Sequence, residues 1–220
     1  MKPLIVLLGT VLLGGCQATA SLPEKHAAQV PWWSLEFMAP IYMTGWVEAS
    51  LVQDINGQLF DHGTGGVIGT GSVDYGTASE LARGWPRTLG GRVRGVIGAD
   101  LPKRVFVRWQ SVVEPQTYRA WVDIPEEARQ IMHASTHRPC ADTPGQGPRY
   151  AASLYLGLAP GGTVQVWARD ECNNPVRVAR AQAEIEPLGP HLGKSGGHYY
   201  PLSDYSKRYV EKYGIPYGSW

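Results

Sequence analysis

Residues 101–125 carry the pattern that most constrains the fold. Val105, Val107 and Trp109 alternate with polar or amphipathic side chains, and a second alternating run follows a polar turn at 114–117. Side chains of a β-strand point to opposite faces with a period of two, so the pattern predicts an antiparallel hairpin with one buried face. We expect this hairpin to be the centre of a sheet and to act as a scaffold rather than as an active site.

The rest of the chain extends this expectation. Glycine (27) and proline (17) are frequent and only 18% of residues are charged, which favours short strands and turns over long helices. Further strands are expected at 32–37, 43–54, 58–60, 152–158, 163–169 and 176–186. Residues 61–98 are dense in glycine and are expected to be irregular, as a surface loop or a recognition loop.

Two segments have the end signals of helices. Residues 125–134 begin with proline and two glutamates, and residues 203–213 lie between a capping Ser203 and Gly214. The sequence therefore predicts a β-rich α+β fold: one domain of antiparallel sheets, sandwich-like, with two or three short helices including a C-terminal one.

The N-terminus has the composition of a secretion signal. Lys2, an apolar run and the small residues before Cys16 are typical of a bacterial lipoprotein signal, in which the cysteine becomes the lipidated N-terminus. The apolar run is shorter than the ~20 residues that span a bilayer. A buried N-terminal helix is the alternative. We expect lipidation at Cys16, with this division of the chain: signal peptide 1–15, lipidated tether 16–30, folded domain 31–220.

Gln17 follows the lipidation site, where lipoproteins held in the inner membrane commonly carry aspartate. By resemblance, the expected location is the periplasmic face of the outer membrane. Cys140 and Cys172 are the two other cysteines, and an oxidising compartment with an even count predicts a disulfide between them. The alternative, a reactive thiol, has no neighbouring pattern to support it.

Metal binding is not expected. His133 and His137 are spaced to share a face of a continuous helix, with Cys140 close by. The residues at 135–136 and 138–139 indicate, however, that the helix ends there, and Cys140 is expected in the disulfide. No cofactor is expected either.

The sequence also argues against three other classes of function. The glycine-rich residues 63–71 are not followed by a helix that could bind phosphate, and no nucleophile motif or paired carboxylates indicate an enzyme. A formal net charge of +1 gives no electrostatic basis for binding nucleic acid.

The C-terminal region is dense in amphipathic rings with basic neighbours. Tyrosine, tryptophan and arginine dominate binding hot spots, because they bury a large area at a low entropic cost. The candidate binding residues are Tyr199, Tyr200, Arg208, Tyr213, Tyr217 and Trp220. The alternative is that about half of these rings pack the C-terminal helix onto the sheet.

Several strings resemble an uncharacterised family of lipoproteins from pseudomonads and related Gram-negative bacteria: the lipobox, residues 99–104, 108–111, 114–118, 157–162, 183–187 and 214–220. The resemblance spans nearly the whole mature chain but identifies no catalytic residues. Small lipoproteins that face the periplasm include immunity proteins against type VI secreted toxins, to which the chain has a looser resemblance.

We therefore expect a lipid-anchored protein-binding module in the periplasm, and in particular an immunity protein that covers the active site of a secreted toxin. The second hypothesis is an envelope lipoprotein that binds a small ligand or a glycan, which would need a concave, aromatic-lined pocket. An enzyme is the third and is not favoured.

Overall fold

The predicted hairpin lies at the centre of the larger of two sheets. In the computed structural model, which describes residues 33–69, 84–91 and 94–220, β5 (Pro102–Ser111) pairs antiparallel with β6 (Gln116–Asp123). Val105 and Val107 are fully buried and Trp109 is 1% exposed. The predicted alternation and the position of the hairpin are therefore confirmed.

The larger sheet has the strand order β10-β6-β5-β2-β3, and β4 pairs with the other end of β2. Its remaining strands are β2 (Gly45–Asp54), β3 (Leu59–Gly63), β4 (Gly66–Ile68) and β10 (Glu184–Ile185). The expectation that the chain is irregular from residue 61 was wrong for residues 61–63 and 66–68. Gly63 and Gly66 both have positive φ and form the corner between β3 and β4, which lets both strands pair with β2. The glycines that suggested an irregular loop in the sequence are therefore required by this corner.

The second sheet has the order β1-β7-β8-β9. Its strands are β1 (Trp33–Met38), β7 (Ala152–Leu158), β8 (Thr163–Arg169) and β9 (Pro175–Gln182). The pairing of β1 with β7 is parallel, whereas the other strand pairs among the described residues are antiparallel. The sheet is therefore mixed, which local sequence patterns do not reveal because a parallel pair joins segments far apart in the chain.

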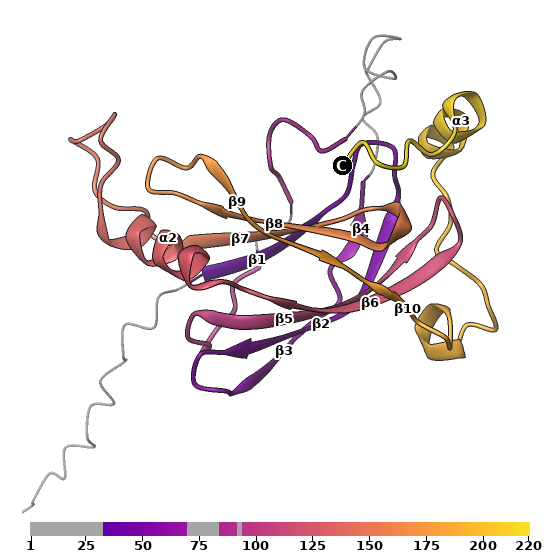
Figure 1. The fold of residues 1–220 in the computed structure, drawn as a ribbon, viewed down its shortest axis with the longest axis horizontal. Coiled ribbons are helices and arrows are strands. Elements are labelled where there is room, and N and C mark those ends of the chain that lie inside the picture. Colours follow the sequence, from indigo (N-terminus) through magenta and orange to yellow (C-terminus); the bar gives the residue numbers. More distant parts are fainter. Residues whose placement is uncertain (1–32, 70–83, 92–93) are drawn as a thin grey trace, which may run out of the picture.

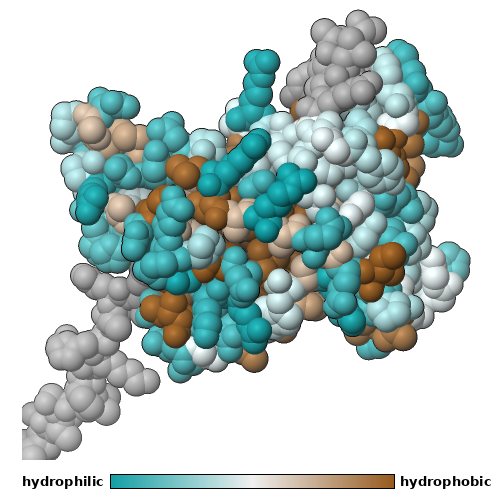
Figure 2. Space-filling model, viewed as in Figure 1, coloured by the Kyte–Doolittle hydropathy of each residue, from teal (hydrophilic) through white to brown (hydrophobic). Residues whose placement is uncertain are grey.

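The two sheets pack face to face in a sandwich-like arrangement, seen from its side in Figure 1. Apolar side chains from alternate positions of both sheets form one core between them, including Leu35, Val107, Leu154 and Val166. The predicted β-rich α+β fold is confirmed. On the side of the molecule shown in Figure 2, hydrophilic residues predominate and hydrophobic residues form separate patches.

The predicted strand at 176–186 is divided between the two sheets. β9 belongs to the four-stranded sheet and β10 to the larger one, and Ala183 lies at the crossing, where its N–H donates to the Gly162 carbonyl at 2.8 Å. The prediction of one continuous strand was wrong because the alternation of side chains continues through the crossing.

Helix α2 (Glu126–His137) lies against β7 and β8 and is longer than predicted. The hydroxyls of Ser135 and Thr136 donate to the carbonyls of Met132 (2.8 Å) and His133 (3.1 Å) within the helix, so these residues do not end it. The helix ends at Arg138, before Pro139.

Helix α3 (Asp204–Tyr213), at the opposite end of the sandwich from α2 in Figure 1, has the predicted end signals. The Ser203 side chain accepts from the Ser206 N–H, and Gly214 with φ 73° donates to the Val210 carbonyl. Two short 3-10 helices, η1 (Pro160–Gly162) and η2 (Pro190–Gly193), complete the elements.

Cys140 and Cys172 form the expected disulfide, with their Cα atoms 4.6 Å apart. It joins the chain after α2 to the turn between β8 and β9, and a loop of 32 residues corresponds to about 3 to 4 kcal/mol in the chain-entropy account. The signal peptide, Cys16 and the tether lie outside the described residues. None of the helices described is long and apolar enough to cross a membrane.

Candidate functional site

The C-terminal aromatic residues divide between two places, and part of them form a second core at the end of the sandwich. Tyr209 is 2% exposed and stacks on Tyr42 with ring centroids 4.7 Å apart, and Trp220 is 8% exposed in the same cluster. Tyr213 packs against Tyr209 at 5.0 Å. The described geometry gives Tyr209 and Trp220 a packing role, as in the alternative derived from the sequence.

The other predicted binding residues lie nearer the surface but do not form one patch with each other. Tyr200 stacks on Trp46 at 4.6 Å, next to the half-buried Tyr199. Tyr217 is 58% exposed and its hydroxyl donates to Glu114 at 2.6 Å. Arg208 is exposed and lies over the ring of Tyr205.

A more concentrated group of recognition-type side chains lies on the outer face of the larger sheet. Trp121 is 41% exposed, and its ring lies 5.4 Å from the ring of Phe106, its cross-strand neighbour. The guanidinium carbon of Arg104 lies 4.3 Å from the centre of the Trp121 ring, and its Nε donates to Gln53 at 2.7 Å. We define the outer patch as Arg104, Phe106, Arg108, Arg119 and Trp121.

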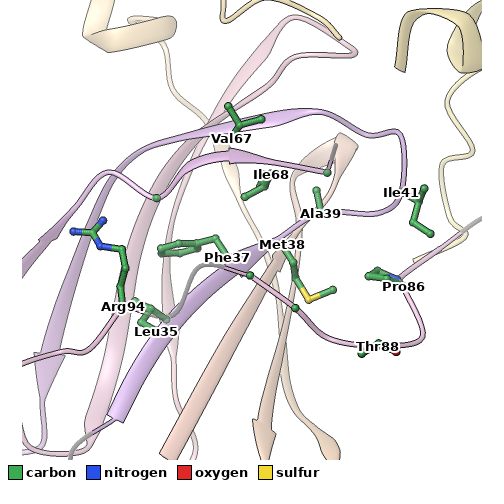
Figure 3. A pocket seen from close by; sticks show the side chains of 14 residues that line it. Leu35, Phe37, Met38, Ala39, Ile41, Val67, Ile68, Pro86, Thr88 and Arg94 are labelled. Carbon is green, nitrogen blue, oxygen red and sulfur yellow. The ribbon is translucent and has the colours of Figure 1, made fainter. Parts of the chain in front are cut away.

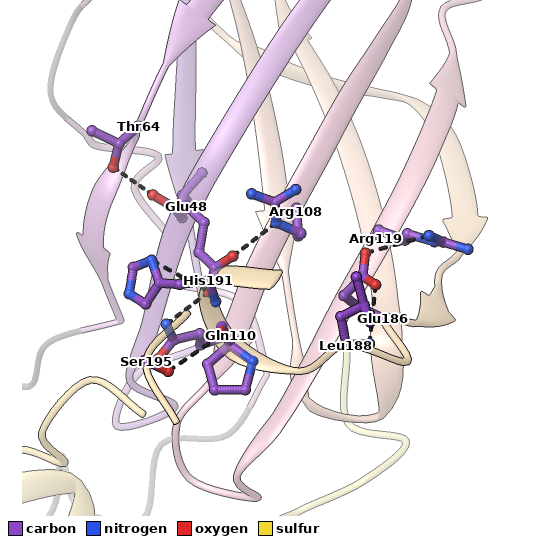
Figure 4. Close-up of polar contacts among 11 residues, drawn as sticks. Glu48, Thr64, Arg108, Gln110, Arg119, Glu186, Leu188, His191 and Ser195 are labelled. Atoms are coloured by element: carbon purple, nitrogen blue, oxygen red, sulfur yellow. Dashed lines mark hydrogen bonds and ion pairs between the residues drawn. The ribbon is translucent and has the colours of Figure 1, made fainter. Parts of the chain in front are cut away.

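Arg108 forms an ion pair with the buried carboxylate of Glu48 (Figure 4). The register between β2 and β5 shifts between Val47 and Ala49, so that Glu48 occupies a β-bulge. The Glu48 side chain is 1% exposed and accepts from Arg108 Nε at 2.8 Å, from Gln110 Nε2 at 2.8 Å and from the His191 N–H at 2.7 Å. Glu48 therefore ties η2 to the sheet and fixes the orientation of Arg108.

Arg119 is held in a similar way by the chain that follows β9. It pairs with Glu184 at 3.0 Å and Glu186 at 3.4 Å, and the Glu186 side chain is only 2% exposed. Glu186 also accepts from the Leu188 N–H (Figure 4). Ion pairs within the chain thus orient both arginines.

The patch is hollowed rather than flat. A depression of about 330 Å³ is lined by side chains of the patch together with Leu192, which is 38% exposed. His191 and Leu192 both have positive φ, 52° and 55°, a conformation that costs about 1 to 2 kcal/mol per non-glycine residue. The hydrogen bond from His191 to Glu48 helps to hold this conformation, which brings Leu192 to the edge of the depression.

The buried carboxylates beside the patch are engaged in ion pairs. Glu48 and Glu186 are already paired with arginine, so they do not form a free acid and base pair. Elsewhere in the described residues, Cys140, Asp142 and Cys172 lie close enough to suggest metal ligands, but the two sulfur atoms form the disulfide.

The predicted histidine pair does not converge on a metal. His133 and His137 lie on one continuous helix, contrary to the prediction that the helix ends before His137. Their rings stack face to face with centroids 3.9 Å apart, and His137 Nδ1 contacts the His133 carbonyl at 2.8 Å. The in-plane lone pairs of stacked rings point in parallel planes, so this arrangement does not present two nitrogen ligands to one ion.

Sequence reasoning missed the outer patch although its signal was present. Phe106, Arg108, Arg119 and Trp121 occupy the alternate positions of the central hairpin that do not face the core. Two aromatic rings and two arginines therefore lie close together on the outward face of neighbouring strands, and a contiguous exposed group of this kind is typical of an interaction site.

Comparison with known proteins gives one match. Residues 17–218 match a family described as a protein of unknown function, DUF2931. The chain belongs to the DUF2931 family. No curated protein and no solved structure matched the chain. The expectation of an uncharacterised family is confirmed to that extent, and the role of this DUF2931 protein has to be argued from its own geometry.

Proposed function

We propose that this DUF2931 protein is a lipid-anchored binding protein on the periplasmic face of the outer membrane, and that its outer patch recognises a protein partner. The observation that carries the proposal is the exposed Trp121 ring, flanked by Phe106 and Arg104. Tryptophan and arginine are the residue types most enriched at binding hot spots.

The charges of the patch indicate what the partner presents. Arg108 and Arg119 are paired with glutamates of this chain, whereas Arg104 bonds the neutral side chain of Gln53. A partner with a carboxylate beside an apolar or aromatic side chain would pair with Arg104 and cover Trp121 at the same time.

The partner class that we propose is a secreted toxin delivered by a type VI system, which the protein neutralises by covering its active site. Three features support this proposal: the lipoprotein signal ending at Cys16, the disulfide between Cys140 and Cys172 that suits an oxidising compartment, and the patch itself.

The test is survival in competition with siblings that carry the toxin. Cells without the gene should be killed, and the wild-type protein should restore survival. Trp121→Ala should fail to protect, since truncating a hot-spot tryptophan costs about 2 kcal/mol, or roughly thirtyfold in affinity. Tyr150→Ala is the matched control, because Tyr150 is an aromatic residue that is 88% exposed outside the patch.

Unchanged survival of the deletion strain would contradict the toxin-neutralising function. Full protection by Trp121→Ala would contradict the assignment of the outer patch as the interface. Equal protein levels of all variants, measured by immunoblot, are required for either reading.

The alternative function, binding of a small ligand, is favoured by one observation: a cavity opens between the two sheets beside β1. Its described lining holds one aromatic ring, Phe37, and two polar side chains, Thr88 and Arg94. A glycan needs stacking rings and several hydrogen-bonding side chains, so the cavity favours an apolar ligand over a sugar.

A further inference from the structure

A cavity of about 470 Å³ opens at the side of the sandwich where β1 and β4 face each other without pairing (Figure 3). Residues 94–96 pair with the first half of β1, through Leu35 N–H to the Arg94 carbonyl and Val96 N–H to the Trp33 carbonyl. Farther along β1, the side chains of Phe37 and Met38 line the cavity together with that of Leu35. The volume lies within the range of small-molecule sites, roughly 300 to 1,000 Å³.

The walls combine apolar side chains with glycine backbone, Pro86 and Thr88. The side chains that line the cavity from the two sheets and the adjoining turn are Leu35, Phe37, Met38, Ala39, Ile41, Val67 and Ile68. Gly65 lets the chain approach closely at this point, because a Cβ atom there would lie 2.6 Å from the Phe37 ring. The apolar side chains of β1, β4 and the adjoining turn give a hydrocarbon chain a surface to contact, and the remaining lining leaves polar groups for the other end of a ligand.

One end of the cavity carries a positive charge. Arg94 is the single charged residue among the described lining residues, and Figure 3 shows its side chain beside Phe37 and Leu35. Arg94 Nη1 donates to the Thr64 carbonyl, which fixes the side chain near the opening. The adjacent His62 is 6% exposed, and burial lowers its pKa, so it remains neutral near pH 7 and brings no second charge.

We infer that this cavity binds an amphiphile with a hydrocarbon chain and a carboxylate headgroup, of the fatty-acid type. The chain would lie between β1 and β4, and the carboxylate would pair with the Arg94 guanidinium at the opening. The inference uses no residue of the outer patch, so it stands or falls independently of the proposed protein partner.

The test uses the full chain carrying Cys16→Ser, which prevents attached acyl chains from competing, in buffer without detergent. The probe is dansyl-labelled undecanoate, whose emission shifts to the blue and intensifies in an apolar site. Saturable binding at equimolar stoichiometry is expected. Arg94→Gln should weaken the carboxylate probe about tenfold, the loss of one charge-assisted hydrogen bond, and should leave its methyl ester unaffected.

Val67→Trp fills the cavity from a residue that is 36% exposed and should abolish binding of both probe forms. Thr88→Trp narrows it from the opposite wall and serves if Val67→Trp unfolds, as checked by thermal unfolding. Arg138→Gln, which removes an exposed charge at the end of α2, is the matched control and should bind as the wild type does.

Three results would overturn the inference: no saturable binding by the wild type, wild-type affinity in both folded tryptophan variants, or equal weakening of acid and ester by Arg94→Gln. Each of these outcomes leaves the survival assay on Trp121→Ala unaffected, so failure of the cavity and failure of the outer patch are distinguishable.

Discussion

Glu36 is a buried carboxyl group on the outer face of the four-stranded sheet, 2% exposed. Burial raises the pKa of Glu36 above its ordinary value of 4.5, and hydrogen bonds from Tyr155 and Ser34 with the charges of Arg169 and Arg149 only partly oppose this. Burial likewise raises the pKa of Tyr155, and the neighbouring Glu36 adds to that effect. Ionisation of Glu36 is therefore less favourable in the folded protein than in the unfolded chain, and it lowers the stability of the fold.

The consequence is a dependence of stability on pH. Because the folded protein binds the Glu36 proton more tightly than the unfolded chain, the stabilisation is fully present below pH 4.5 and is lost as pH rises through the raised pKa. Glu36→Gln keeps an oxygen acceptor for Ser34 and Tyr155 but cannot ionise. Urea unfolding at about pH 5 and about pH 8 should therefore show a smaller loss of stability in the variant than in the wild type.

Glu127→Gln is the control, because Glu127 is an exposed glutamate on α2 and should keep the wild-type pH dependence. If Glu36→Gln loses as much stability as the wild type between the two pH values, the buried carboxyl is not the source of the effect.

At the scale of elements, the bulge in β2 joins the larger sheet to η2 through one side chain. Glu48 accepts hydrogen bonds from β5 and from the chain at His191, more than a hundred residues away. Its side chain is almost completely buried, so both hydrogen bonds are shielded from water. The outer patch depends on this junction, since Arg108 and Leu192 are both positioned through it.

Removing the carboxylate should be costly. Glu48→Ala leaves the Arg108 side chain, 16% exposed, without its partner, and should lower the free energy of unfolding by about 3 kcal/mol. Hydrogen exchange at the His191 amide should become faster. In Glu184→Ala, the lost partner of Arg119 has a side chain that is 70% exposed, so the expected cost is below about 1 kcal/mol. Similar costs for the two variants would contradict the central role of Glu48.

What the sequence could predict at this scale was the local part of the fold. The hairpin at 101–125 and the caps at Ser203 and Gly214 were predictable, because their signals lie within the elements themselves. The parallel pairing of β1 with β7, the short β4 and the passage from β9 to β10 depend on contacts between distant segments. The bulge at Glu48 and the cavity beside Phe37 were out of reach for the same reason.

The same limit applied to the candidate site. The density of rings after residue 198 is visible in the sequence, but only the fold shows that Trp220 joins Tyr209 and Tyr42 in a second core. An aromatic residue in a strand with one buried face can point inward or outward, and its position in the alternation decides which. Trp121 could have been identified by that criterion.

At the scale of the whole molecule, the two candidate sites have different architectures. The outer patch lies on a sheet face and is supported by buried ion pairs, whereas the cavity lies between sheet edges and is lined by apolar side chains with Arg94 at one end. Under the two proposals, the protein recognises a protein partner with the outer patch and an amphiphile in the cavity.

The most direct test of the central claim is a cross-linking measurement at residue 121 in intact cells. A photoreactive phenylalanine analogue, which keeps a large aromatic ring in the patch, replaces Trp121 in the full chain. In a second chain it replaces the exposed Tyr150 as the control. If the outer patch binds the toxin, position 121 should form a covalent adduct with one secreted protein, position 150 should form none, and the adduct should be lost when Arg104→Ala is added. Adducts of equal yield at both positions, or an adduct that persists in the Arg104→Ala chain, would contradict it.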